Sequence, residues 1–229
     1  MRTMQTVAAC VLVLICVWGP DFSAQIPQPA GRRVLIVADE LSIQFRSTPW
    51  TRELMSRIQR VLDGDDVVRV VLTGGARTVG VSADTAVGMG LVPRVIALAQ
   101  PTSVDADELR LRSDRASTTV ASALRSLSGA GEGPTIIVYF TEGYPAFVPQ
   151  PIEFVQEALR LNATVYVMDP RGFSEAARQL DAKDWEAYVA ATVGSLRTLA
   201  RGTKGRTVFT RSEFDAVISG LTQTTQFSQ

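Results

Sequence analysis

The chain has 229 residues, equal numbers of basic and acidic side chains, and 46% hydrophobic residues, which fits one globular domain with a full core. Its zero net charge excludes the strongly basic surface that is typical of proteins that bind nucleic acid. Histidine is absent, which removes the usual general base, the usual zinc ligand and the Ser-His and Cys-His nucleophile pairs.

The first segment has the pattern of a secretory signal peptide. Arg2 gives a positive start, Val7–Val17 is a short apolar run, and Ser23-Ala24 offers small residues for cleavage. The run is shorter than the ~18–20 residues that a membrane-spanning helix needs. We therefore expect residues 1–24 to be a signal peptide, and the mature protein to be secreted or periplasmic with no membrane span.

Strand patterns recur along the rest of the chain. Residues 25–31 are a polar, proline-bearing linker, and Arg33–Asp39 is an unbroken apolar run that suits a strand buried on both faces of a parallel sheet. Thr78–Val81 follows the Gly74-Gly75 turn closely enough to pair antiparallel with the strand before it. The other strands are predicted at Val67–Thr73, Thr135–Thr141, Ala163–Met168 and Arg206–Thr210.

Helical patterns alternate with these strands. We expect a serine or threonine cap, Ser47 or Thr48, before Pro49 for the first helix, and Ser212, with Asp215, for the last. Gln100–Arg112 is predicted to be a polar connection, and residues 223–229 a polar tail that frays. The helices are predicted at Thr48–Gly64, Ala83–Leu98, Asp114–Leu127, Pro151–Leu161, Asp184–Arg201 and Ser212–Thr222.

This alternation predicts the fold class. It is a doubly wound α/β fold with a mostly parallel central sheet, helices on both faces and one antiparallel edge strand. In such sheets ligands bind beyond the carboxyl ends of the strands. Oxygen-bearing side chains gather at these predicted ends and suit Mg²⁺, Mn²⁺ or Ca²⁺: Asp39, Glu40 and Ser42 after the first strand, Ser117–Thr119 before a helix, and Glu142 after a later strand.

Several phrases together resemble the von Willebrand factor A-type domain, and more narrowly a bacterial secreted subgroup related to it. The resemblance extends from Arg32 to about Leu221, so we expect this domain at residues 32–222. It rests on VLIVADELSIQF, DVVRVVLTGG, TTVASALRSL, TIIVYFTEGYP and LRTLARGTKGRTVFT, in this order.

The resemblance implies a candidate metal-ion-dependent adhesion site. The family pattern is Asp-x-Ser-x-Ser followed by a threonine and an aspartate. Asp39 matches the first aspartate, Thr118 the threonine and Glu142 the second aspartate, while Ser42 lies one position out of register. The two serine positions hold leucine and isoleucine, Leu41 and Ile43. The implied ligand set for a divalent cation such as Mg²⁺ is therefore degenerate.

Three functions follow from this sequence. The first is a non-enzymatic module that binds another protein through the carboxyl edge of the sheet, where Tyr144 and Phe147 are candidates for an exposed recognition loop. The second is an extracytoplasmic metal-assisted hydrolase that uses Asp39 and Glu142 as acid and base. The third is a metal-free structural domain, in which replacing both acids by alanine changes neither stability nor binding.

Overall fold

Six strands form one sheet. The structure is a computed structural model that describes residues 31–44, 47–74, 78–82, 106–129, 133–145, 148, 152–173 and 182–226. The signal peptide, nearly all of the linker and the helix predicted at Ala83–Leu98 lie outside these residues. The strands are β1 (Arg33–Ala38), β2 (Val67–Leu72), β3 (Thr78–Ser82), β4 (Thr135–Phe140), β5 (Thr164–Met168) and β6 (Arg206–Val208).

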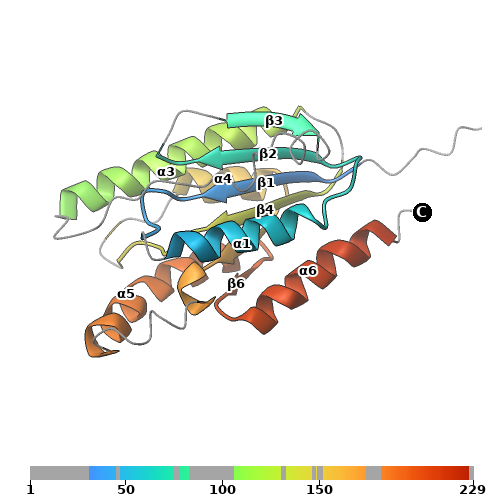
Figure 1. Ribbon diagram of the computed structural model, residues 1–229. Helices are drawn as coiled ribbons and strands as arrows, with labels where there is room; N and C mark the ends of the chain where they lie inside the picture. The colour runs from blue at the N-terminus through green and yellow to red at the C-terminus, as the bar shows by residue number, and fades with distance from the viewer. Residues whose placement is uncertain are drawn as a thin grey trace, which may run out of the picture.

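The strand order is β3-β2-β1-β4-β5-β6 (Figure 1). β1 lies between two parallel partners, and Ile36 is in register with Val70 of β2 and Val138 of β4. β3 alone pairs antiparallel, at the edge of the sheet. The doubly wound α/β fold and its antiparallel edge strand are thus confirmed. The chain reverses its winding direction between β1 and β4, and a crevice for a ligand is usual at that position.

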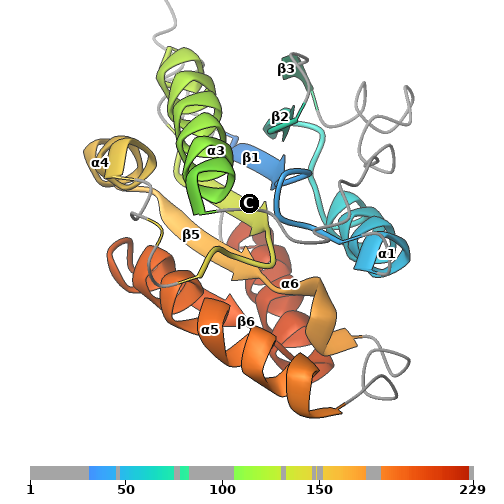
Figure 2. The same ribbon diagram turned by 90° about the vertical axis from the view of Figure 1, so that its left-hand side faces the viewer.

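Helices pack on both faces of the sheet, as Figure 2 shows for α1 on one side and α3 and α4 on the other. One core joins the sheet to α1, η2 and α6, and the other joins it to α3, α4 and α5. Strand residues alternate between the two cores: Ile36 and Val138 belong to the first, and Leu35 and Ile137 to the second. The bounds are α1 (Thr48–Gln59), α3 (Ala106–Leu127), α4 (Ile152–Arg160), η2 (Pro170–Phe173), α5 (Ala182–Arg201) and α6 (Arg211–Gln226).

Two predicted polar segments are helical instead. α3 begins at Ala106, so the second half of the predicted polar connection forms its first two turns. Arg110 pairs there with Asp107, and Arg112 with Glu108. These i,i+3 and i,i+4 ion pairs support an exposed helical face where the sequence predicted a polar connection. At the other end of the chain, α6 continues to Gln226, so the predicted tail is helical over its first half.

The helix caps also differ from the prediction. Thr210 and Glu213 form a reciprocal capping box before α6: the Glu213 carboxylate accepts from the Thr210 backbone N–H at 2.9 Å, and the Thr210 hydroxyl accepts from the Glu213 N–H at 3.3 Å. The predicted cap, Ser212, lies inside the helix. Ser47 precedes α1 but makes no side-chain cap hydrogen bond.

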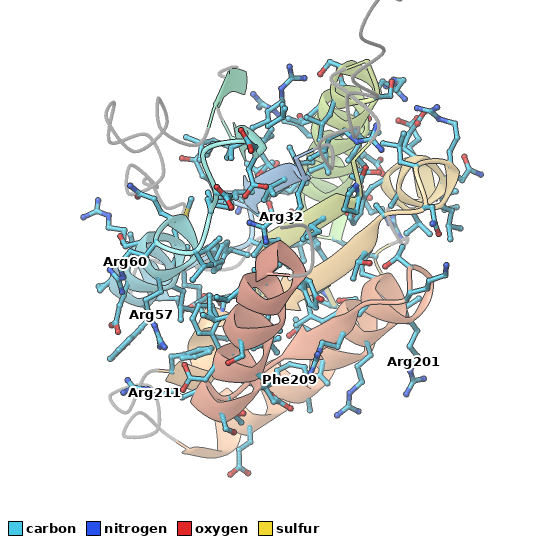
Figure 3. The ribbon with its side chains drawn as sticks, turned by 90° about the vertical axis from the view of Figure 1, so that its right-hand side faces the viewer. Arg32, Arg57, Arg60, Arg201, Phe209 and Arg211 are labelled. Atoms are coloured by element: carbon cyan, nitrogen blue, oxygen red, sulfur yellow. The ribbon has the colours of Figure 1, made fainter. Side chains whose placement is uncertain are left out.

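Arg32 fixes the amino edge of the sheet just before β1 (Figure 3). Its side chain forms a buried ion pair with Asp66, which precedes β2. The same guanidinium donates to the backbone carbonyl oxygens of Leu221 in α6, at 2.6 Å, and Val61 after α1, at 3.2 Å. One side chain therefore ties three segments of the chain to the start of the central strand.

Candidate functional site

The carboxyl edge of the sheet, which faces the viewer in Figure 2, brings polar side chains together. Ala38 is in register with Leu72 and Phe140. The next residues, Asp39, Thr73 and Thr141, therefore lie side by side immediately beyond the strands. Because parallel strands end at a common edge, residues far apart in sequence become neighbours here.

Asp39 is the centre of this arrangement. It is completely buried, and each carboxylate oxygen accepts two hydroxyl groups. Oδ1 accepts from Thr73 at 2.7 Å and Tyr144 at 3.3 Å. Oδ2 accepts from Thr141 at 3.0 Å and Tyr139 at 3.1 Å. We call these four hydroxyl residues and Asp39 the hydroxyl network.

Burial dominates the electrostatics of the network. Loss of solvent raises the pKa of Asp39, although hydrogen bonds from hydroxyls, that of Thr73 first, lower it in part. The pKa values of Tyr139 and Tyr144 lie well above the usual value for tyrosine, first because both phenols are buried and then because Asp39 is close. Both phenols therefore stay protonated and act as donors to the carboxyl group.

Ser42 adjoins the network. Its hydroxyl lies 2.8 Å from the Thr141 hydroxyl and accepts from the backbone N–H of Glu142 at 3.2 Å. Ser42 thus contacts the network at Thr141 and at Asp39, whose backbone carbonyl oxygen lies 3.3 Å from its hydroxyl, and it links both residues to the backbone of Glu142. The structure brings these two predicted site residues, Asp39 and Ser42, close together.

Glu142 is also completely buried, but it has its own partners. Its Oε1 accepts from the backbone N–H of Gln44 at 2.9 Å. Burial raises the pKa of Glu142, and the positive charge of Arg171 and a hydrogen bond from Ser47 lower it in part. The two predicted acids therefore lie at the same edge but in separate polar clusters.

Thr118 is not part of either cluster. It is exposed on α3, and its hydroxyl donates to Glu153 of α4 at 3.4 Å. The helical period accounts for this placement, because Ala116, Val120 and Ala123 form the buried stripe and Thr118 falls on the opposite side. The spacing of the apolar residues in α3 was therefore a signal in the sequence that Thr118 lies away from the other predicted ligands.

Sequence reasoning missed all four hydroxyl donors. Tyr144 was predicted to lie in an exposed recognition loop, but it is only 8% exposed and its hydroxyl points to Asp39. Gly143 makes this turn possible: its φ is +77°, a conformation that favours glycine, and an added Cβ would lie 2.8 Å from Leu196. Phe147 lies outside the described residues.

A buried ion pair follows β5, close enough to Glu142 for the charge of Arg171 to lower the pKa of that carboxyl group. Asp169 and Arg171 are both buried and form a bidentate ion pair, with Nε of Arg171 2.9 Å from Oδ1 and Nη2 2.6 Å from Oδ2. Nη2 also donates to the Thr192 hydroxyl of α5 at 2.9 Å.

The predicted ligands Asp39, Ser42, Thr118 and Glu142 do not form the divalent-cation site that the resemblance to the family implies. A hard cation needs several oxygen ligands converging on one point. Asp39 gives all its acceptor capacity to hydroxyl groups, Thr118 lies on another surface, and Leu41 and Ile43 offer only hydrocarbon. Within the described part of the chain, no group of three or more acidic residues is placed to hold a metal ion. Cation binding stays a prediction of the sequence.

Comparisons with known proteins find only distant structural similarity. No family model matches the chain, and no curated protein matches it either. Among solved structures, it is similar to proximal thread matrix protein 1 from the mussel byssus in two crystal forms. The first has a TM-score of 0.43 and 11% identity over 85% of this chain and 48% of that one. The second has a TM-score of 0.42 and 10% identity over 85% and 46%. The chain thus spans about half the length of these neighbours.

Proposed function

We propose that the chain is a von Willebrand factor A-like module that binds another protein outside the cytoplasm, with no catalytic role and without a divalent cation. The observation that carries the proposal is the hydroxyl network. Asp39 is fully buried and saturated by hydrogen bonds, so its carboxyl group supports the loops of the carboxyl edge. Neither Asp39 nor Glu142 is open to a substrate from solvent, which weighs against the hydrolase.

The carboxyl edge also carries exposed apolar side chains. Leu111 is 66% exposed in α3 and Ile152 is 62% exposed at the start of α4. Each helix runs back along the sheet before a parallel strand, so its amino-terminal end lies at the carboxyl edge (Figure 2). Apolar side chains that protrude from a folded surface can be buried in the apolar centre of an interface with another protein. We therefore infer that this edge is the binding surface.

The proposed location rests on the leader sequence. Arg2 followed by the apolar run Val7–Val17 has the pattern of a secretory signal. In the described part of the chain, no helix combines the length and apolar character that crossing a membrane requires.

The binding proposal is tested with matched surface variants. Partners captured by the mature chain from secreted and envelope fractions are purified, and their affinity for each variant is measured by calorimetry. Leu111→Glu and Ile152→Glu are expected to weaken binding about tenfold or more, because a charge enters an apolar contact. Leu159→Glu is the control: Leu159 is also exposed, at 54%, but lies near the other end of α4. Equal losses from all three variants would contradict the assigned surface.

Cation dependence is tested separately by thermal unfolding. A cation at ~100 times its dissociation constant would raise the unfolding temperature by about 5–10 °C in a domain of this size. We expect no such rise when Mg²⁺, Mn²⁺ or Ca²⁺ is added after EDTA treatment, and no change in partner affinity. A rise that disappears in Asp39→Ala would mean that the network opens to hold an ion, and the cation-free proposal would be wrong.

A further inference from the structure

A cavity of about 290 Å³ lies between α5 and the ends of β5 and β6. It lies at the same edge of the sheet as the hydroxyl network, but its lining includes no residue of that network and neither Leu111 nor Ile152. Val189, Val193 and Arg197 line it from one face of α5, at successive intervals of four residues, and Phe209 lines it from the segment after β6. Its volume is near the lower end of the range for small-molecule sites.

The two charged residues on the polar side of the cavity neutralise each other. Asp169 and Arg171 line it, and their bidentate ion pair is buried. Because the two charges offset each other, this pair presents a fixed polar surface with little net charge. A ligand with its own full charge would not find its counter-ion here.

Arg197 supplies the unmatched charge. It is exposed, and its guanidinium lies 5.9 Å from the centre of the Phe209 ring. No acidic side chain forms an ion pair with Arg197 within the ranges that the structure describes. A guanidinium over an aromatic ring keeps its N–H groups available, and these match a carboxylate in a bidentate geometry.

We propose that this cavity binds a small carboxylate with an aromatic or branched aliphatic body. The apolar body lies among Val189, Val193 and Phe209, and the carboxylate pairs with Arg197 at the rim. Arg197 decides the sign of the ligand, because Asp169 and Arg171 already pair with each other and Glu142, whose pKa the charge of Arg171 also lowers, does not line the cavity. The cavity volume limits the ligand to a compact molecule. This site does not depend on the proposed protein-binding function.

Benzoate is the probe that tests the site, with benzyl alcohol as its neutral counterpart. Binding to the mature chain is followed by NMR chemical shifts. Benzoate is expected to bind saturably, with a dissociation constant on the order of 1 mM, and benzyl alcohol at least about tenfold more weakly, because it lacks the charge that pairs with Arg197. Inorganic phosphate, which has charge but no apolar body, is expected to produce no saturable shift in α5.

Two variants locate the site. Arg197→Gln is expected to weaken benzoate binding about tenfold, and Arg201→Gln to leave it unchanged, since Arg201 (Figure 3) is exposed on the same helix and does not line the cavity. Val193→Phe is expected to abolish binding by filling the cavity, and circular dichroism verifies that this variant is folded. Absence of saturable benzoate binding, equal binding of benzyl alcohol, or equal losses from Arg197→Gln and Arg201→Gln would each overturn the proposal.

Discussion

The two ends of β1 each bury a charged side chain, but the protein stabilises the two charges in different ways. At the amino end, Arg32 meets the opposite charge of Asp66 and two backbone carbonyl oxygens. At the carboxyl end, Asp39 meets four hydroxyl groups. Arg32 depends on the charge of one specific partner, Asp66. The charge of Asp39 is stabilised instead by several neutral hydroxyl groups, which can reorient. The amino edge should therefore be the more sensitive of the two to substitution.

Arg32→Met is the substitution with the largest expected effect. It leaves the Asp66 carboxylate buried without its guanidinium, and breaking a buried pair in this way costs about 3–5 kcal/mol of unfolding free energy. The loss is measured by denaturant unfolding of residues 25–229. It should exceed the loss from any single substitution in the hydroxyl network.

The double variant Arg32→Met/Asp66→Asn is the control for this explanation. Once the unpaired charge is removed as well, we expect about 2 kcal/mol of the loss to return. If the double variant is as unstable as Arg32→Met, the loss comes from the carbonyl contacts with α1 and α6, and the ion pair is not what fixes the amino edge.

Asp39→Ala is expected to come next, at about 3 kcal/mol. It removes the acceptor for four buried hydroxyls, but these can turn toward one another, as Ser42 and Thr141 already do at 2.8 Å. Asp39→Asn keeps the shape and one acceptor oxygen, so about half that loss is expected. If both variants are as stable as the wild type, the network has no structural role. That result would agree with the metal-free domain of the sequence analysis, in which alanine at Asp39 and Glu142 leaves stability unchanged.

The sequence predicted the fold well because its signals were local. The unbroken apolar runs at β1 and β4 indicated central strands, and the glycines after β2 indicated a tight turn into an antiparallel edge. The failures also have local causes. The first turns of α3 are polar because they face solvent, and the cap of α6 lies two residues earlier than predicted, since Thr210 and Glu213 satisfy the reciprocal pattern.

The site was harder to predict because it depends on register. Asp39 stood out as an acid at the end of a strand, but nothing local to it indicated Thr73 or Thr141. These residues reach Asp39 only because β2 and β4 pair with β1 without an offset. Tyr139 resembled any other residue of an apolar strand. The turn at Gly143, which directs Tyr144 inward, becomes a signal only when its positive φ is known.

Tyr144→Phe and Tyr139→Phe sharpen the comparison within the network. Each removes one buried hydrogen bond to the carboxyl group, so we expect each to cost about 1–2 kcal/mol. An alkaline absorbance titration adds a second readout. Because the pKa values of both phenols are raised by burial and by Asp39, they should ionise only as the fold is lost. Each variant should then remove part of the absorbance change that accompanies alkaline unfolding; an unchanged amplitude would contradict the buried placement.

The smallest expected effect is a dependence of the unfolding free energy on pH that is caused by Asp39. Burial raises the pKa of Asp39 in the folded state, so at intermediate pH the folded chain holds a proton that the unfolded chain has released. The resulting stability is complete below the unfolded pKa and is lost as pH rises through the folded pKa. The stability difference between the wild type and Asp39→Asn should therefore grow as pH falls from neutral. Glu157→Gln supplies a control of opposite sign, because hydrogen bonding to Arg160 lowers the pKa of Glu157, and its contribution shrinks over the same change. If both differences move in the same direction, burial is not what governs the ionisation of Asp39.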